Sequence, residues 1–232
     1  MTAQNVTISA IADSFSGYLA VPTSPTGAGI ALIQEIFGVN SAMRKIADSY
    51  AEAGYFVLVP DLFWRLEPKV DLDPQYEDQL AKAYDFYGRF DVDKGIEDLQ
   101  AALTFLRHYP GCSGKVGSVG FCLGGKLAYL MATRTDADCN VSYYGVAIES
   151  NLAEAPTIQK PLILHLAEND EFVPPDAQAT IQQALKENPL ITIYSYAGVS
   201  HAFGRVDSAA YRPEAAELAR DRTLAFLQQH LS

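Results

Sequence analysis

The turn Gly120-Phe121-Cys122-Leu123-Gly124 has the pattern of a nucleophile elbow, with a cysteine where a serine is usual. Glycines flank such a turn because larger side chains would clash with the neighbouring strand and helix. The N–H groups and the positive dipole end of the helix that follows would favour a thiolate at Cys122. The pattern therefore predicts a nucleophilic cysteine. The alternative is a small buried apolar residue, which is the more usual role of an isolated cysteine.

Acyl transfer by such a nucleophile also needs a base, an acid that orients the base, and N–H groups that stabilise an oxyanion. Asp170 and His201 each come just after a run of residues that predicts a buried strand. The chain order cysteine, aspartate, histidine is that of the α/β-hydrolases, and all three side chains are expected at one edge of a sheet. Glu168 and Glu171 are the alternatives to Asp170 as the orienting acid.

Glu35 is a further carboxylate at the end of an apolar stretch that begins at residue 27. A carboxylate at the end of a buried strand is costly without a partner, so Glu35 is a candidate site residue. An ion pair with an arginine for structure alone is the alternative. The loop after this strand commonly donates one N–H to the oxyanion. We therefore expect the backbone N–H groups of Ile36 and Leu123 to form the oxyanion hole.

The elements that must position these residues alternate between strands and helices along the chain. Patterns typical of strands occur at 5–13, 15–22, 27–38, 55–60, 115–121, 139–148, 161–168 and 190–196. Helices are expected at 40–53, in the latter half of 61–90, and at 91–109, 123–133, 176–187 and 213–231. This alternation predicts an α/β fold, with a mostly parallel sheet covered by helices on both faces and an N-terminal antiparallel hairpin. The length of 232 residues fits one domain over residues 1–232.

Composition narrows the possible partners. The formal net charge is −11 and no lysine- or arginine-rich run occurs, so neither nucleic acid nor an anionic membrane surface is an expected partner.

We find no signal-peptide pattern and no run of about 18 apolar residues, which leads us to expect a cytoplasmic protein. The three cysteines are Cys112, Cys122 and Cys139, and their spacing indicates neither a disulfide framework nor a zinc site. No exposed apolar stripe stands out, so a monomer is expected.

Seven stretches of the chain together resemble the dienelactone hydrolase family, of carboxymethylenebutenolidase type. They are QEIFGVN, GYFVLVPDLFWR, DVDKGIEDLQAALTFLR, GKVGSVGFCLGGKLAY, SYYGV, NDEFVPP and SHAFGR. The resemblance implies a triad of Cys122, His201 and Asp170. It also implies that Glu35 contacts the cysteine and takes part in forming its thiolate. Arg205 matches the family arginine that holds a substrate carboxylate and pairs with the glutamate.

The sequence departs from the family at two positions. A second carboxylate-binding arginine of the family would fall near Ala81, where the nearest cation is Lys82, and Ala202 stands where the family has a serine. Lys82 is a candidate substrate-binding residue, with a solvated helix position as the alternative. Phe37 and Tyr84 are candidates for the pocket lining, with packing in the core as the alternative.

The predicted activity is hydrolysis of a small anionic enol-lactone or ester through a thioester acyl-enzyme, and the chemistry requires no metal or organic cofactor. One alternative is a broader carboxylesterase or thioesterase of the same fold with another substrate. A non-enzymatic redox sensor that uses Cys122 as an oxidisable thiol is the second alternative.

Overall fold

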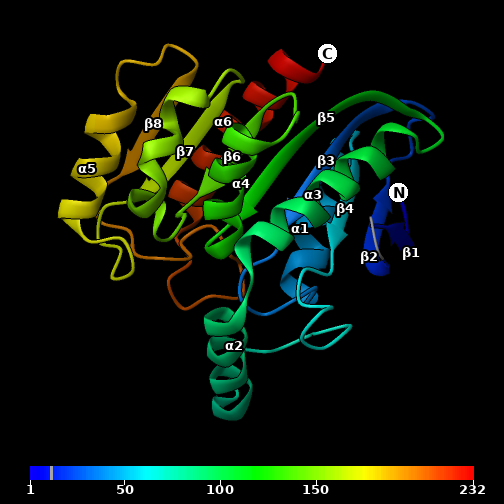
Figure 1. Ribbon diagram of the computed structural model, residues 1–232, viewed down its shortest axis with the longest axis horizontal. Coiled ribbons are helices and arrows are strands. Elements are labelled where there is room, and N and C mark those ends of the chain that lie inside the picture. The colour runs from blue at the N-terminus through cyan, green and yellow to red at the C-terminus, as the bar shows by residue number, and fades with distance from the viewer. Residues whose placement is uncertain (11–12) are drawn as a thin grey trace. The chain divides into compact units, whose positions relative to one another are not determined.

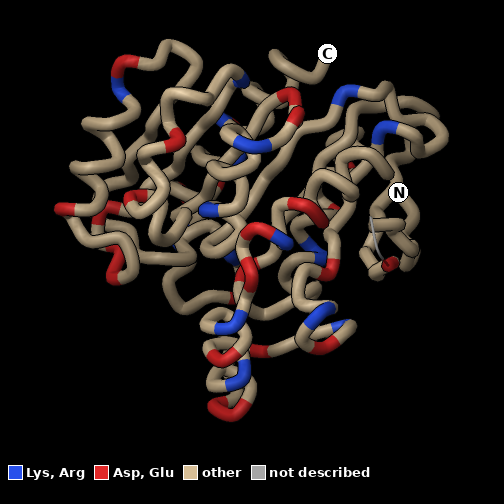
Figure 2. Tube along the Cα trace, viewed as in Figure 1, with Lys and Arg blue, Asp and Glu red and all other residues tan. Residues whose placement is uncertain are grey.

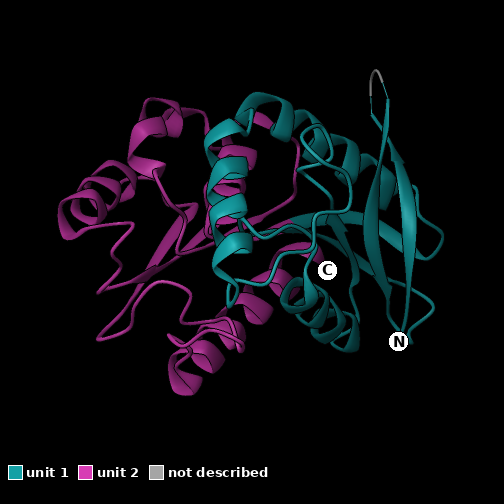
Figure 3. Ribbon diagram, turned by 90° about the horizontal axis from the view of Figure 1, so that it is seen from below, with its two compact units in different colours: residues 1–117 teal, residues 118–232 magenta. Residues whose placement is uncertain are grey.

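The computed structural model describes residues 1–10 and 13–232, which form two compact units. Unit 1 comprises Met1–Gly117 and unit 2 comprises Ser118–Ser232 (Figures 1 and 3). The last part of the first expected strand, at 11–12, lies outside the described residues. The prediction of one domain over the whole chain stays a prediction. Within the described residues, no helix is long and apolar enough to cross a membrane.

Unit 1 begins with the predicted antiparallel hairpin. Its strands are β1 (Thr2–Ser9), β2 (Ser14–Val21), β3 (Gly27–Ile33) and β4 (Phe56–Pro60), in the spatial order β1-β2-β4-β3. β2 pairs antiparallel with both β1 and β4, and β3 pairs parallel with β4. Its helices are α1 (Ser41–Glu52), α2 (Glu77–Arg89) and α3 (Val92–Arg107). Asn40 caps α1 and Asp91 caps α3, since each side chain accepts a first-turn N–H, from Met43 and Lys94.

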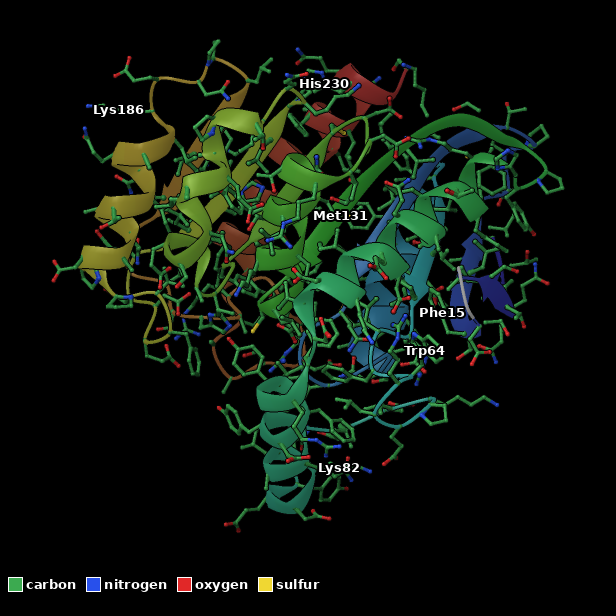
Figure 4. The ribbon with its side chains drawn as sticks, viewed as in Figure 1. Phe15, Trp64, Lys82, Met131, Lys186 and His230 are labelled. Atoms are coloured by element: carbon green, nitrogen blue, oxygen red, sulfur yellow. The ribbon has the colours of Figure 1, made fainter. Side chains whose placement is uncertain are left out.

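The segment between β4 and α2 is tied down by a buried carboxylate on α3. Asp98 accepts hydrogen bonds from Nε1 of Trp64 at 2.9 Å and from Nη2 of Arg65 at 3.0 Å. The Trp64 ring also stacks on Phe15 of β2, with centroids 5.7 Å apart and planes 10° apart (Figure 4). The Arg65 guanidinium lies 4.3 Å from the centroid of the same ring. Because Asp98 is fully buried, these two partners offset the cost of removing its carboxylate from water.

We expect Asp98→Ala to lower the free energy of unfolding by about 2–3 kcal/mol, because it removes the buried acceptor of Trp64 and the ion pair of Arg65. Urea unfolding measures the change. Asp85→Ala is the matched control, since it breaks only the exposed pair with Arg89 on α2 and is expected to cost at most about 0.5 kcal/mol. Equal losses in the two variants would contradict this account of the segment.

Unit 2 contains parallel strands only. β5 (Cys112–Phe121) begins in unit 1, and β6 (Asn140–Tyr143), β7 (Leu162–Ala167) and β8 (Ile191–Tyr196) follow in the spatial order β5-β6-β7-β8. The helices are α4 (Leu123–Arg134), α5 (Pro175–Leu185) and α6 (Pro213–Leu231), with a 3-10 segment, η1 (Ile148–Thr157), after β6. Figures 1 and 3 show α4 and α6 on opposite faces of these strands. The predicted α/β class, parallel strands and helices are therefore confirmed, whereas η1 was not predicted.

Candidate active site

Cys122 lies in a strained turn between β5 and α4. Its φ of 58° and ψ of −116° are rare for a residue with a side chain, so the surrounding structure must hold it there. Its N–H donates to the carbonyl oxygen of Tyr143 at 3.0 Å. A Cβ on Gly120 would lie 1.9 Å from the carbonyl oxygen of Gly124, so the turn has no space for a side chain at Gly120. This geometry is that of the predicted elbow.

A second glycine pair lets α4 approach the end of β6 closely. A Cβ on Gly125 would lie 2.5 Å from the carbonyl oxygen of Tyr143, and one on Gly145 would lie 2.7 Å from the carbonyl carbon of Gly125. The five-residue motif by itself predicts close packing only at Gly120 and Gly124. The doubled glycine at 124–125 is the sequence signal for this further contact.

His201 and Asp170 form a buried pair beyond the ends of β8 and β7. Nδ1 of His201 lies 2.8 Å from Oδ2 of Asp170, whose Oδ1 accepts the backbone N–H of Phe172 at 2.9 Å. Glu168 instead accepts the N–H of Gly198 at 2.8 Å and is exposed, as is Glu171. Of the three acidic side chains considered, Asp170 is therefore the one hydrogen-bonded to the imidazole.

Two aromatic rings enclose the imidazole of His201. The Tyr144 ring meets it edge-on with centroids 4.9 Å apart, and the Phe172 ring does so at 4.8 Å. Such contacts restrict rotation of the imidazole and exclude water from its faces. No sequence motif pointed to Tyr144 or Phe172 as neighbours of the histidine.

The electrostatics around His201 favour its charged form. Burial by itself lowers the pKa of His201, but the hydrogen bond to Asp170 and the electrostatic influence of the nearby Cys122 and Asp170 outweigh burial and raise this pKa to about 10. Nε2 is buried and makes no hydrogen bond to the residues that the structure describes. A catalytic hydrogen bond that is long without substrate can shorten when substrate binds. The arrangement therefore favours the imidazolium form of His201 next to Cys122.

Leu123 and Arg205 are the remaining predicted residues of unit 2, and they lie close in sequence to Cys122 and His201 respectively. Leu123 is the first residue of α4, and N–H groups in the first turn of a helix have no intrahelical acceptor. The backbone turns after His201, where Ala202 has a φ of 62° and its carbonyl oxygen accepts the N–H of Arg205 at 3.1 Å. This tight turn keeps the backbone of Arg205 close to that of Ala202, the residue after His201.

Three predicted residues of unit 1 follow β3 directly. Glu35, Ile36 and Phe37 are all buried, with Glu35 only 3% exposed. The carbonyl oxygen of Phe37 accepts the N–H of Leu72 at 2.9 Å, which fixes the loop that carries them. Glu35 thus lies at the carboxyl end of a parallel strand, where site residues of α/β folds occur.

Lys82 and Tyr84 lie on α2, along which acidic and basic residues are interspersed (Figures 2 and 4). Nζ of Lys82 pairs with the Glu67 carboxylate at 2.8 Å and lies 5.4 Å from the centroid of the Phe86 ring. Tyr84 is 49% exposed. These contacts suit the solvated helix position for Lys82, and substrate binding by Lys82 and Tyr84 stays a prediction.

Comparisons with known proteins identify the family. The dienelactone hydrolase family model matches residues 15–231. A carboxymethylenebutenolidase of Pseudomonas putida is 39% identical over 214 residues, 92% of this chain and 91% of that protein. Carboxymethylenebutenolidase 1 of Cupriavidus pinatubonensis is 33% identical over 213 residues, 92% of this chain and 91% of that protein. A solved structure from Klebsiella pneumoniae, provisionally named a dienelactone hydrolase, has a TM-score of 0.86, 25% identity and 98% coverage of both chains. The chain therefore belongs to the dienelactone hydrolase family, shares its α/β-hydrolase fold and is a hydrolase.

Proposed function

We propose that this hydrolase opens an enol-lactone of the dienelactone type, with Cys122 as nucleophile, His201 as general acid and base, and Asp170 as the orienting carboxylate. The single observation that carries the proposal is the buried His201–Asp170 pair next to a cysteine held in a strained elbow. The carboxymethylenebutenolidases that align with nearly the whole chain support the substrate class.

In the first step, the thiolate of Cys122 attacks the lactone carbonyl carbon, and the carbonyl oxygen becomes an oxyanion. The backbone N–H groups of Leu123 and Ile36 stabilise that oxyanion, an effect of about 3 kcal/mol for each donor. The ring C–O bond then breaks, which leaves a thioester on Cys122. The departing enolate takes a proton from the His201 imidazolium and remains tethered to the acyl group.

In the second step, the neutral imidazole of His201 removes a proton from water, and the water oxygen attacks the thioester carbonyl carbon. The C–S bond breaks and releases the Cys122 thiolate beside the regenerated imidazolium. Asp170 holds Nδ1 of the ring so that Nε2 carries out both proton transfers. The product is a ring-opened carboxylic acid, which loses its remaining proton to the solvent.

The choice of sulfur agrees with an enol-lactone substrate. A thiolate is a good nucleophile and a good leaving group, so its attack is reversed when the leaving group of the substrate is poor. A stabilised enolate leaves readily, and the tetrahedral intermediate then collapses forward. A cysteine enzyme therefore suits enol esters better than simple alkyl esters.

Glu35 and Arg205 complete the proposal. Glu35 takes part in forming the thiolate, and Arg205 binds the carboxylate of the substrate. Support comes from the burial of Glu35 at the end of β3 and from the turn that holds Arg205 beside the histidine loop. Phe37, Tyr84 and Lys82 remain candidate substrate contacts.

A second candidate function is a broader carboxylesterase or thioesterase with another natural substrate. The observation that favours it is the Lys82–Glu67 pair, which neutralises the cation that would replace the second family arginine. Ala202 also lacks the hydroxyl of the family serine.

Ultraviolet assays of cis- and trans-dienelactone, beside p-nitrophenyl acetate, test the proposal in wild type and Cys122→Ser. We expect rapid dienelactone opening that the substitution abolishes. Hydrolysis of p-nitrophenyl acetate alone, lost in the same variant, would reject the lactone substrate and favour the broader esterase. Dienelactone opening that survives the substitution would reject Cys122 as the nucleophile.

A further inference from the structure

A cavity of about 360 Å³ lies between α6 and the strands β7 and β8 of unit 2. Its walls include Ile163, Leu190 and Tyr194 from the strand side and Arg222, Phe226 and His230 from α6. His230 marks the last turn of α6 in Figure 4. Pro161, Ile163 and Leu190 are at or before the amino ends of β7 and β8, whereas Asp170 and His201 follow their carboxyl ends. The cavity is therefore distinct from the candidate active site.

Arg222 is the charged group of this cavity, and it lacks an acidic partner. Its guanidinium lies 4.0 Å from the centroid of the Tyr194 ring and 5.3 Å from the centroid of the Tyr196 ring. Among the residues that the structure describes, no carboxylate lies within ion-pair distance of Arg222. The chain has 28 acidic and 17 basic residues, so a half-buried arginine without an acidic partner is unexpected.

The position of the guanidinium is fixed before any ligand arrives. The guanidinium faces the ring of Tyr196. The hydroxyl of Tyr196 lies 2.8 Å from Nδ1 of the buried His165, and Nε2 of His165 lies 3.0 Å from Oγ1 of Thr223. Thr223 follows Arg222 on α6, so the same network holds the helix and the strand that flank the cavity. A fixed cation loses little conformational freedom when it binds an anion. A guanidinium has five N–H donors in a planar arrangement that suits a carboxylate.

The other walls suit a flat apolar group. Phe226 and His230 form an edge-to-face pair with centroids 4.6 Å apart, and Leu190 is 39% exposed beside them. A ligand with a carboxylate on a small ring or unsaturated chain would satisfy both the cation and the apolar wall. We propose that this cavity binds a small aromatic or unsaturated carboxylate, with its carboxylate on Arg222 and its apolar part against Phe226 and Leu190.

Isothermal titration calorimetry with benzoate tests this proposal, and it uses no activity readout, so it is independent of the proposed function. We expect wild type to bind benzoate, and the neutral benzamide at least about tenfold more weakly, because a charge-assisted pair is lost. Arg222→Gln should weaken benzoate binding by a similar factor, with partial rescue in Arg222→Lys. Arg205→Gln tests whether benzoate binds at the candidate active site instead of in this cavity. Benzoate binding at Arg222 should be unchanged in that variant.

Backbone amide chemical shifts on titration with benzoate locate the ligand in wild type, so the test holds even if the Arg222 variants fail to fold. Shifts that concentrate at Leu190, Tyr194 and Phe226 support the proposal. Three results would overturn it. They are no binding of benzoate, benzamide binding as strong as benzoate binding, or benzoate binding and chemical-shift changes that are lost in Arg205→Gln but kept in Arg222→Gln.

Discussion

Cys122→Ala is expected to lower kcat/KM for an activated ester by at least about four orders of magnitude, because removal of a covalent nucleophile disables the whole catalytic unit. The expected loss lies in kcat, since the cysteine acts on the reacting carbon rather than on remote parts of the substrate. Initial rates with p-nitrophenyl acetate, at enzyme concentrations high enough to detect the residual rate, measure the change.

Cys112→Ala is the matched control for this substitution. Cys112 is a free, half-buried cysteine like Cys122, but it begins β5, at the end of the strand opposite to the elbow. Its replacement should leave kcat/KM close to the wild-type value. Retention of more than a hundredth of the wild-type activity by Cys122→Ala would exclude the covalent mechanism. Without the nucleophile, substrate binding and oxyanion stabilisation alone give a rate far below that level.

Asp170→Asn is expected to lower kcat by about four orders of magnitude, because the amide holds the imidazole in the wrong tautomer. In the wild type, Oδ2 of Asp170 accepts from Nδ1 of His201, and Nε2 is left for proton transfer. An asparagine would present an NH₂ group or a weaker acceptor to Nδ1. Glu168→Gln is the control, since Glu168 contacts Gly198 and should be replaceable at little cost in rate.

The same variant should change the titration of His201. Its pKa is raised to about 10 in the folded protein, so the charged pair stabilises the fold below the unfolded value near 6.5 and this contribution is lost as pH rises through about 10. Asp170→Asn should lower the pKa of His201, which histidine resonances in an NMR titration report. The stability difference from wild type should shrink above about pH 10. An unchanged histidine titration would contradict the role of Asp170 as the charged partner.

The placement of Cys122, Asp170 and His201 in the fold was predictable because their signals are local in sequence. Cys122 has a five-residue turn motif, and Asp170 and His201 each follow a strand that its apolar pattern reveals. The parallel topology then brings residues that follow the strands to one edge of the sheet. The 2.8 Å contact between Asp170 and His201 agrees with this expectation.

Contacts between residues far apart in the chain could not be predicted in this way, because they leave no local pattern. Tyr144 meets His201 through a backbone with a φ of 37°, a conformation that no sequence rule assigns to tyrosine. Asp98 pairs with Trp64 and Arg65, which lie more than 30 residues earlier in the chain. Likewise, η1 contains Pro156 and follows Ala147 in the left-handed region, so it lacks an ordinary helix start.

Rapid acid quenching of the wild-type enzyme during turnover of p-nitrophenyl acetate, followed by peptide mass spectrometry, tests the central claim most directly. The account predicts one acetyl group on the peptide that contains Cys122, labile to hydroxylamine as a thioester is, and no such group in Cys122→Ala. Steady turnover with no acyl group on Cys122 at any quench time, or an acyl group on another residue, would contradict it.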